Sequence, residues 1–156
     1  MKNALASALL LILLSVSSSA SFSQKPADTV LVKAYIAKQA KQEGGEEYED
    51  ARKIIEGDLD NDNTADLAVL YTIEGQHGTN NYVQYLAVFL RVNGKLVPVT
   101  RTVVGGKSRR SVELESIDKG VIHLTTLSYT AKDAACCPSK KGKTQYTLVN
   151  RKLKES

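Results

Sequence analysis

Cysteine, histidine and proline are scarce in this sequence, which has two, two and three of them among 156 residues. The two cysteines are adjacent, so neither has a distant partner within the chain. The sequence has no Gly-x-Ser-x-Gly motif, which carries the nucleophile of many hydrolases, and no apolar run long enough to span a bilayer. A chain of this length supports one core. A multidomain enzyme and a coiled coil are therefore excluded, and there is no internal repeat.

The first twenty residues predict a secretory signal peptide. Lys2 provides the positive start, Ala4 to Leu14 the eleven-residue apolar run, and Ser18 to Ala20 a cleavage site of small residues. Cleavage after Ser23 is an alternative, and no cysteine for lipid attachment lies nearby. We therefore expect residues 21–156 to form a single globular domain, exported to the periplasm or secreted, with no membrane span in the mature form. Export also argues against nucleic acid as a partner.

The charges are segregated along the chain. Residues 43–74 contain eleven acidic residues against two basic ones, whereas residues 91–156 contain fourteen basic residues against five acidic ones. These two segments cancel each other, so the modest net charge of +4 conceals a strong asymmetry along the chain. Such asymmetry favours internal charge complementarity, or a cation held by the acidic half, over binding of an acidic partner.

The first element of the predicted domain is a helix. Asp28 is placed to cap a helix from about Thr29 to Gln42, which Gly44 and Gly45 would end. One broad apolar face would consist of Leu31, Val32, Tyr35 and Ile36, with Lys33, Ala40 and Lys41 turned away. The Val-Leu-Val start leaves a strand as the alternative for this segment.

The rest of the chain has the alternation and turn residues of β-structure. Residues 66–73 form a nearly unbroken apolar run, which predicts a strand buried on both faces. Asn93-Gly94 predicts a tight hairpin, and Pro98 predicts an edge position or a bulge. We expect an α+β fold, in which the N-terminal helix precedes a mainly antiparallel β meander of about seven strands, at 53–56, 66–73, 82–92, 96–104, 112–116, 121–129 and 144–149.

The richest chemistry lies in the acidic loop, residues 58–66. Four aspartates occupy its positions 1, 3, 5 and 9, and Thr64 at position 7 could add its backbone carbonyl; the aspartates are Asp58, Asp60, Asp62 and Asp66. Carboxylates this close repel one another unless a cation neutralises them, and hard oxygen ligands suit calcium. An EF-hand is excluded because Val69 stands where its acidic position 12 would be. An Asp/Asn-rich turn without an ion is the alternative.

The spacing Asp-x-Asp-x-Asp-x-x-x-Asp before an apolar strand resembles the calcium loop of FG-GAP or VCBS repeats. The resemblance implies that Asp58, Asp60, Asp62, Thr64 and Asp66 ligate calcium. It covers about fifteen residues in a single copy, and Asn61 and Asn63 replace the glycines usual in that family. A β-propeller is therefore not implied, and calcium would act as a structural clamp rather than a catalyst.

Cys136 and Cys137 have three interpretations: a rigid vicinal disulfide that shapes a loop, a redox or soft-metal site, and buried or intermolecular thiols. An exported location is oxidising and favours the disulfide. The chain also resembles small exported bacterial proteins with a late Cys-Cys-Pro-Ser motif, here Cys136 to Ser139, together with Gly78 and Asn80 to Tyr82. This resemblance implies no activity.

Basic residues cluster late in the chain and could bind anionic polysaccharide or lipid headgroups, although a solvated basic face is the favoured interpretation: Lys107, Arg109, Arg110, Lys140, Lys141 and Lys143. His77 and His123 could meet only through the fold. We therefore expect a non-enzymatic, calcium-stabilised binding domain, with an unknown envelope protein or a polysaccharide as its partner. The alternatives are a redox or soft-metal protein that uses Cys136 and Cys137, and a small envelope inhibitor.

Overall fold

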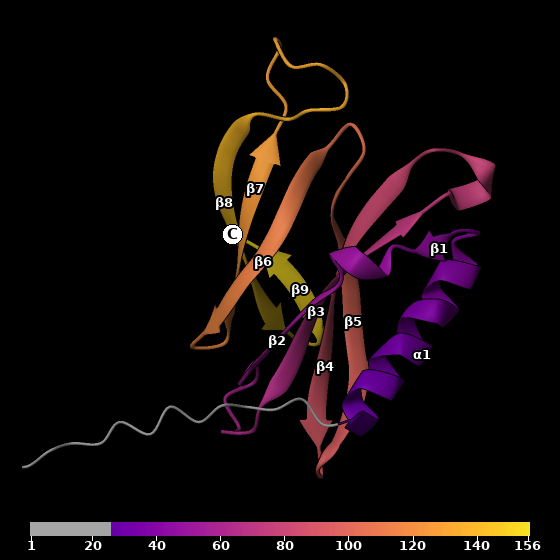
Figure 1. Ribbon diagram of the computed structural model, residues 1–156. Helices are drawn as coiled ribbons and strands as arrows, with labels where there is room; N and C mark the ends of the chain where they lie inside the picture. The colour runs from indigo at the N-terminus through magenta and orange to yellow at the C-terminus, as the bar shows by residue number, and fades with distance from the viewer. Residues whose placement is uncertain (1–25) are drawn as a thin grey trace, which may run out of the picture.

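A computed structural model describes residues 26–156 (Figure 1). The predicted signal peptide and both of its cleavage positions lie outside the described residues. Helix α1 (Pro26–Gln42) comes first, and short 3₁₀ turns η1 (Glu49–Ala51) and η2 (Gln76–Gly78) interrupt the strands that follow. The strands are β1 (Glu46–Glu47), β2 (Lys53–Gly57), β3 (Asp66–Glu74), β4 (Tyr82–Val92), β5 (Lys95–Gly106), β6 (Arg110–Asp118), β7 (Val121–Ser128), β8 (Lys140–Val149) and β9 (Lys152–Glu155).

The α+β class and the antiparallel pairing are confirmed, but the described chain has nine strands rather than about seven. The two strands that the sequence did not predict, β1 and β9, lie at opposite ends of the strand order in the sheet. β1 has only two residues, too few for a periodic signal. β9 follows a turn in which Asn150 and Arg151 both have positive φ, 50° and 60°, without a glycine to mark it.

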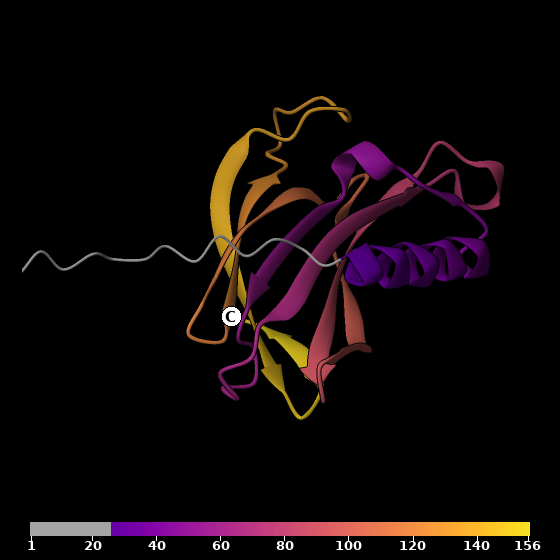
Figure 2. The same cartoon turned by 60° about the horizontal axis from the view of Figure 1, so that its bottom comes forward.

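The strands form three layers with the helix (Figures 1 and 2). One face of β3 and β4 packs on α1, and the opposite face packs on β6, β7 and β8, so two apolar cores share one central sheet. β3 shows this division: Val69 and Tyr71 belong to the core on the helix side, whereas Ala68 and Leu70 belong to the other core. The expected strand with two buried faces is thus confirmed.

Helix α1 forms as expected, and the alternative of a strand is wrong. It begins at Pro26, three residues before the predicted start, because proline is well suited to a first helical turn. Asp28 therefore lies inside the helix rather than capping it. The expectation that Ala40 turns away is also wrong: Val32, Ile36 and Ala40 follow an i, i+4, i+8 stripe, and all three are buried.

Ion pairs hold both ends of α1 on the sheet. Arg91 Nη2 lies 2.7 Å from Asp28 Oδ2, and these side chains are only 10% and 9% exposed. At the other end, Arg101 Nη2 lies 2.6 Å from Glu43 Oε1.

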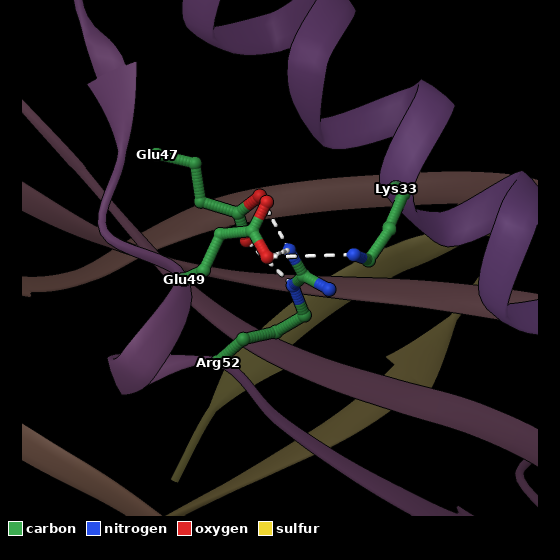
Figure 3. Close-up of polar contacts among 4 residues, drawn as sticks. All are labelled: Lys33, Glu47, Glu49 and Arg52. Carbon is green, nitrogen blue, oxygen red and sulfur yellow. Dashed lines mark hydrogen bonds and ion pairs between the residues drawn. The ribbon is translucent and has the colours of Figure 1, made fainter.

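A third group, drawn in Figure 3, fastens the segment after the helix. Arg52 donates two hydrogen bonds to the Glu47 carboxylate, at 2.6 and 2.7 Å, and Lys33 of α1 reaches Glu49 at 3.4 Å. The hydrogen bonds to Glu47 keep the pKa of Arg52 above its usual value despite partial burial.

The β4–β5 hairpin forms as predicted. Asn93 and Gly94 have φ of 50° and 77°, the conformation that a two-residue hairpin requires. Val88 pairs with Thr100 and the next residue, Phe89, pairs with Pro98, so the extra residue of a bulge lies beside the proline.

β5 pairs with β6 only at Gly106 and Arg110, which lets β6 to β9 fold over the central sheet.

Among the described residues, no helix has the length and hydropathy needed to cross a membrane.

Candidate functional site

The acidic loop joins β2 to β3. These strands form an antiparallel hairpin in which Gly57 and Asp66 are the pair next to the loop. Both flanks are strands, which fits the exclusion of an EF-hand. Asn61 and Asn63 have positive φ, 64° and 62°. Asparagine tolerates this left-handed conformation better than most residues, so the sequence allows the chain to reverse tightly here.

Asp58 organises the backbone of this loop. Its carboxylate accepts hydrogen bonds from the backbone N–H groups of Asn61, Asp62 and Asn63, at 2.7, 3.2 and 2.9 Å. Asp62 in turn accepts one from the N–H of Thr64 at 2.7 Å. The aspartates therefore hold the conformation of their own loop through local hydrogen bonds from side chain to backbone, as is common in turns.

Three of the predicted ligands come together. One carboxylate oxygen each of Asp58, Asp60 and Asp66 lies within 4.8 Å of the other two. Asp62 is not part of this group, and its carboxylate instead accepts a hydrogen bond from the backbone N–H of Thr64.

Asp66 connects the loop to the core. It is 1% exposed, and its carboxylate accepts hydrogen bonds from the N–H of Leu59 at 2.9 Å and the N–H of Arg91 at 2.8 Å. Burial raises the pKa of Asp66 above its usual value, and the charges of Asp60 and Asp62 add to the effect, while the two N–H groups oppose it. Arg91 also donates to the carbonyl of Ala65, at 3.0 Å. Through Arg91, the loop is linked to Asp28 at the start of α1.

These carboxylates retain capacity for a cation. An ionised carboxylate offers about four lone-pair sites; Asp58 uses three for backbone N–H groups and Asp66 uses two. Asp60 accepts no hydrogen bond from any residue within 26–156. The donor set is hard oxygen, which fits calcium or another hard divalent cation. Three carboxylates alone fall short of the six to eight oxygens that calcium takes, so water or backbone carbonyls would have to complete the shell.

The cysteine loop crosses from β7 to β8 at the top of Figure 1. Cys136 and Cys137 form a vicinal disulfide, and both residues are exposed. The interpretation as buried or intermolecular thiols is therefore wrong. A disulfide can join adjacent cysteines where the backbone between them turns locally, and no distant segment of the chain is needed.

Asp133 holds the base of this loop. Its carboxylate accepts hydrogen bonds from the N–H groups of Thr130 and Ser139, at 2.8 and 3.0 Å, and from the Ser139 hydroxyl at 2.7 Å. These hydrogen bonds lower the pKa of Asp133 to about 2, and the one from the Thr130 N–H contributes most. Tyr129 closes the loop from the other side by donating to the carbonyl of Ala135 at 2.9 Å.

The two histidines do not meet. His77 lies in η2 beside Gly44, whereas His123 lies on β7 between Ser116 and Gln145. They also line different hollows of the surface. Neither lies on the cysteine loop, so a combined thiol and imidazole site among the described residues is not formed.

A cluster of aromatic residues and one arginine lies beneath the end of α1, and no local sequence pattern predicts it. Arg101 lies over the ring of Tyr85, 4.7 Å from its centroid, and Tyr85 stacks on Tyr71 at 5.3 Å. Burial alone would lower the pKa of Arg101, but the hydrogen bond to Glu43 raises that pKa above its usual value. The Tyr71 hydroxyl and Arg101 Nη1 are both buried and neither has a hydrogen-bond partner in residues 26–156.

Comparison with known proteins adds no family to this picture. No family model matches the chain, and neither a curated protein nor a solved structure does.

Proposed function

We propose that this protein is an exported, non-enzymatic binding domain whose fold is clamped by one calcium ion in the acidic loop. The observation that carries the proposal is the convergence of Asp58, Asp60 and Asp66 on one point, with oxygens within 4.8 Å. Like charges at this spacing repel one another, and a divalent cation between them removes that repulsion.

The position of Asp66 explains how such an ion would stabilise the fold. Asp66 is buried and bonded to the backbone of β4 through Arg91, whose guanidinium pairs with Asp28 of α1. A cation on Asp66 would therefore neutralise a carboxylate whose burial is costly and would strengthen the start of β3. Asp62 and the Thr64 carbonyl would join after a small rearrangement of the loop, as the FG-GAP resemblance implies.

The expected affinity is modest. Extracellular calcium modules have dissociation constants of about 10⁻⁴–10⁻³ M. At a calcium concentration ten times the constant, binding would stabilise the domain by about 1.4 kcal/mol. Such a site suits an extracytoplasmic compartment and acts as a structural clamp.

Calorimetric titration of residues 21–156 with calcium chloride tests the clamp, with magnesium chloride as the comparison ion. We expect a saturable heat with calcium and a rise in melting temperature. Asp60→Asn is the informative variant because Asp60 is exposed and accepts no hydrogen bond within residues 26–156, so the substitution removes one negative charge from the site without disturbing the loop. Asp50→Asn, an exposed aspartate of η1, is the matched control. A wild-type chain without calcium heat and without a shift in melting temperature would overturn the proposal.

A binding role is supported by the two exposed loops that the fold holds in place. Asp133 and Tyr129 brace the cysteine loop, and Lys107 braces the loop from Gly75 to Asn81 through a 2.6 Å hydrogen bond to Asn80. Loops that are rigid before binding lose less conformational entropy when a partner binds. An envelope protein or a polysaccharide is the proposed class of partner.

The exposed disulfide supports one second candidate, thiol–disulfide exchange. A dithiol reductant would become a disulfide while Cys136 and Cys137 take up two electrons and two protons. Lys132, Lys140 and Lys141 flank the loop in sequence and would favour the thiolate forms. Turnover in a disulfide-exchange assay, absent from a Cys136→Ser variant, would support this candidate over the binding role.

A further inference from the structure

Beyond the C-terminal end of α1, the sheet face that the helix covers continues into an open hollow of about 540 Å³. Its floor is apolar and comes from β4 and β5, with Val83, Tyr85 and Val103. Its rim is polar and comes from η2, the first residues of β4 and the turn between β5 and β6. The volume lies within the range of small-ligand sites, about 300–1,000 Å³.

Backbone hydrogen bonds join the segments of this rim to one another. The N–H of His77 donates to the carbonyl of Gly44 at 2.9 Å, which ties η2 to the end of α1. The N–H of Lys107 donates to the carbonyl of Tyr82 at 3.0 Å, and Lys107 Nζ donates to Asn80 Oδ1 at 2.6 Å. The hollow is therefore formed before a ligand arrives.

Two glycines allow these segments to approach so closely. A Cβ at Gly106 would lie 2.8 Å from the carbonyl oxygen of Tyr82, and a Cβ at Gly44 would lie 3.0 Å from Nδ1 of His77. Gly106 and Gly44 also have positive φ, 144° and 65°, which other residues rarely adopt. The sequence thus specifies this arrangement of backbone.

The electrostatic balance of the hollow is positive. Its acidic residue, Glu43, is already paired with Arg101 at 2.6 Å. Two cations remain on the rim, Lys107 and Arg109, and Arg109 has no ion-pair or side-chain hydrogen-bond partner among residues 26–156. An anionic group would be attracted to this side of the hollow, and a guanidinium can hold a carboxylate with two parallel hydrogen bonds.

The remaining lining suits a sugar ring. Gln76, Asn81 and Ser108 provide amide and hydroxyl groups on the rim, above the apolar floor. A purely apolar ligand would leave these polar groups without partners when it excluded water. Hydroxyls of a saccharide can satisfy them, and its apolar face can lie against the apolar floor of the hollow.

We propose that this hollow binds an acidic saccharide, with Arg109 and Lys107 on the carboxylate and the apolar floor against the sugar ring. The proposal names a ligand class for the proposed binding function, and it does not depend on the calcium clamp. The acidic loop precedes β3 and the hollow follows its other end, so nine residues of strand, roughly 30 Å, separate the two sites.

The test is a titration of residues 21–156 with trigalacturonic acid, followed by calorimetry and by amide chemical shifts. EDTA is present because the trisaccharide itself binds calcium. We expect saturable binding with shifts at His77, Tyr82 and Arg109. Maltotriose, the neutral trisaccharide, and inorganic phosphate, a small anion, are the comparison ligands, and both should bind at least about tenfold more weakly.

Arg109→Ala should weaken binding of the trisaccharide at least about tenfold, the loss expected for one charge-assisted pair. Arg151→Ala, an exposed arginine in the turn before β9, is the matched control and should bind as wild type does. No binding of trigalacturonic acid, equal binding by Arg109→Ala, or equal affinity for phosphate would each overturn the proposal. Asp60→Asn should leave this binding unchanged, so failure of the calcium clamp and failure of the saccharide site are distinguishable.

Discussion

The side chain of Gln84 on β4 pairs with the backbone of Val112 on β6 as a neighbouring strand would. Gln84 Oε1 accepts a hydrogen bond from the N–H of Val112 at 2.9 Å, and Gln84 Nε2 donates to the carbonyl of Val112 at 3.1 Å. Gly105 makes room, because a Cβ there would lie 2.5 Å from Gln84 Oε1. β6 pairs with β5 at one position only, so this amide provides the link that ordinary strand pairing does not supply.

Replacing Gln84 by methionine should therefore destabilise the domain by about 2 kcal/mol, because two buried backbone groups of Val112 lose their partners. Urea unfolding followed by circular dichroism measures the change. Gln145→Met, at an exposed glutamine of β8, is the control and should change stability by less than about 0.5 kcal/mol. Equal stability of the two variants would contradict the role given to Gln84.

The buried pair between Arg91 and Asp28 should matter far more than the exposed pair between Lys33 and Glu49. Asp28→Ala leaves the Arg91 guanidinium buried without its partner, and we expect a loss of about 3 kcal/mol. Lys33→Ala removes a pair whose side chains are 52% and 63% exposed, and should cost less than about 1 kcal/mol. Double-mutant cycles in urea measure both couplings, and similar coupling energies would contradict the distinction.

Stability should fall at alkaline pH, in part through Tyr146. Burial, and then the neighbouring Glu155 carboxylate, raise the pKa of Tyr146 to about 12, whereas an unfolded tyrosine titrates near pH 10. Its contribution is therefore complete below about pH 10 and is lost as pH rises toward 12, because the unfolded chain releases this proton first. Tyr146→Phe should make the free energy of unfolding fall less steeply over this window. An unchanged slope would contradict the assignment.

Removing the disulfide should have little effect on global stability. A bridge between adjacent residues closes a ring that constrains only two of them, so the double variant Cys136→Ser, Cys137→Ser should lose less than about 1 kcal/mol. Asp133→Ala should instead loosen the whole loop, since three hydrogen bonds end on that carboxylate. Faster amide hydrogen exchange at Ser139 in the Asp133 variant, with little change in the serine variant, is the expected pattern. The reverse pattern would show that the disulfide holds the loop.

Local features were predictable from the sequence because each depends on residues near one another in the chain. The strand from Asp66 shows its two buried faces as an unbroken apolar run, and β4 begins and ends at the predicted residues, Tyr82 and Val92. Asn93-Gly94 marks its hairpin through two positive φ angles. The adjacency of Cys136 and Cys137 allows the disulfide that the structure contains.

Other features were out of reach because they join residues that only folding brings together. The spacing of the acidic loop singled out four aspartates equally, but only Asp66 is buried, and the Asp62 carboxylate accepts a backbone hydrogen bond and stays outside the group that Asp58, Asp60 and Asp66 form. The start of α1 was misjudged because Asp28 resembles a cap locally, while its actual partner, Arg91, lies 63 residues away.

The sequence by itself determined the order of most elements, the tight turns and the concentration of carboxylates and sulfur in two loops. The tertiary structure decided which charges are buried, how Gln84 links β4 to β6, and that η2 and the turn after β5 meet around one hollow. Periodicity and turn preferences are properties of neighbouring backbone conformations. Burial and pairing across the sheet depend on packing between distant segments, which no local pattern contains.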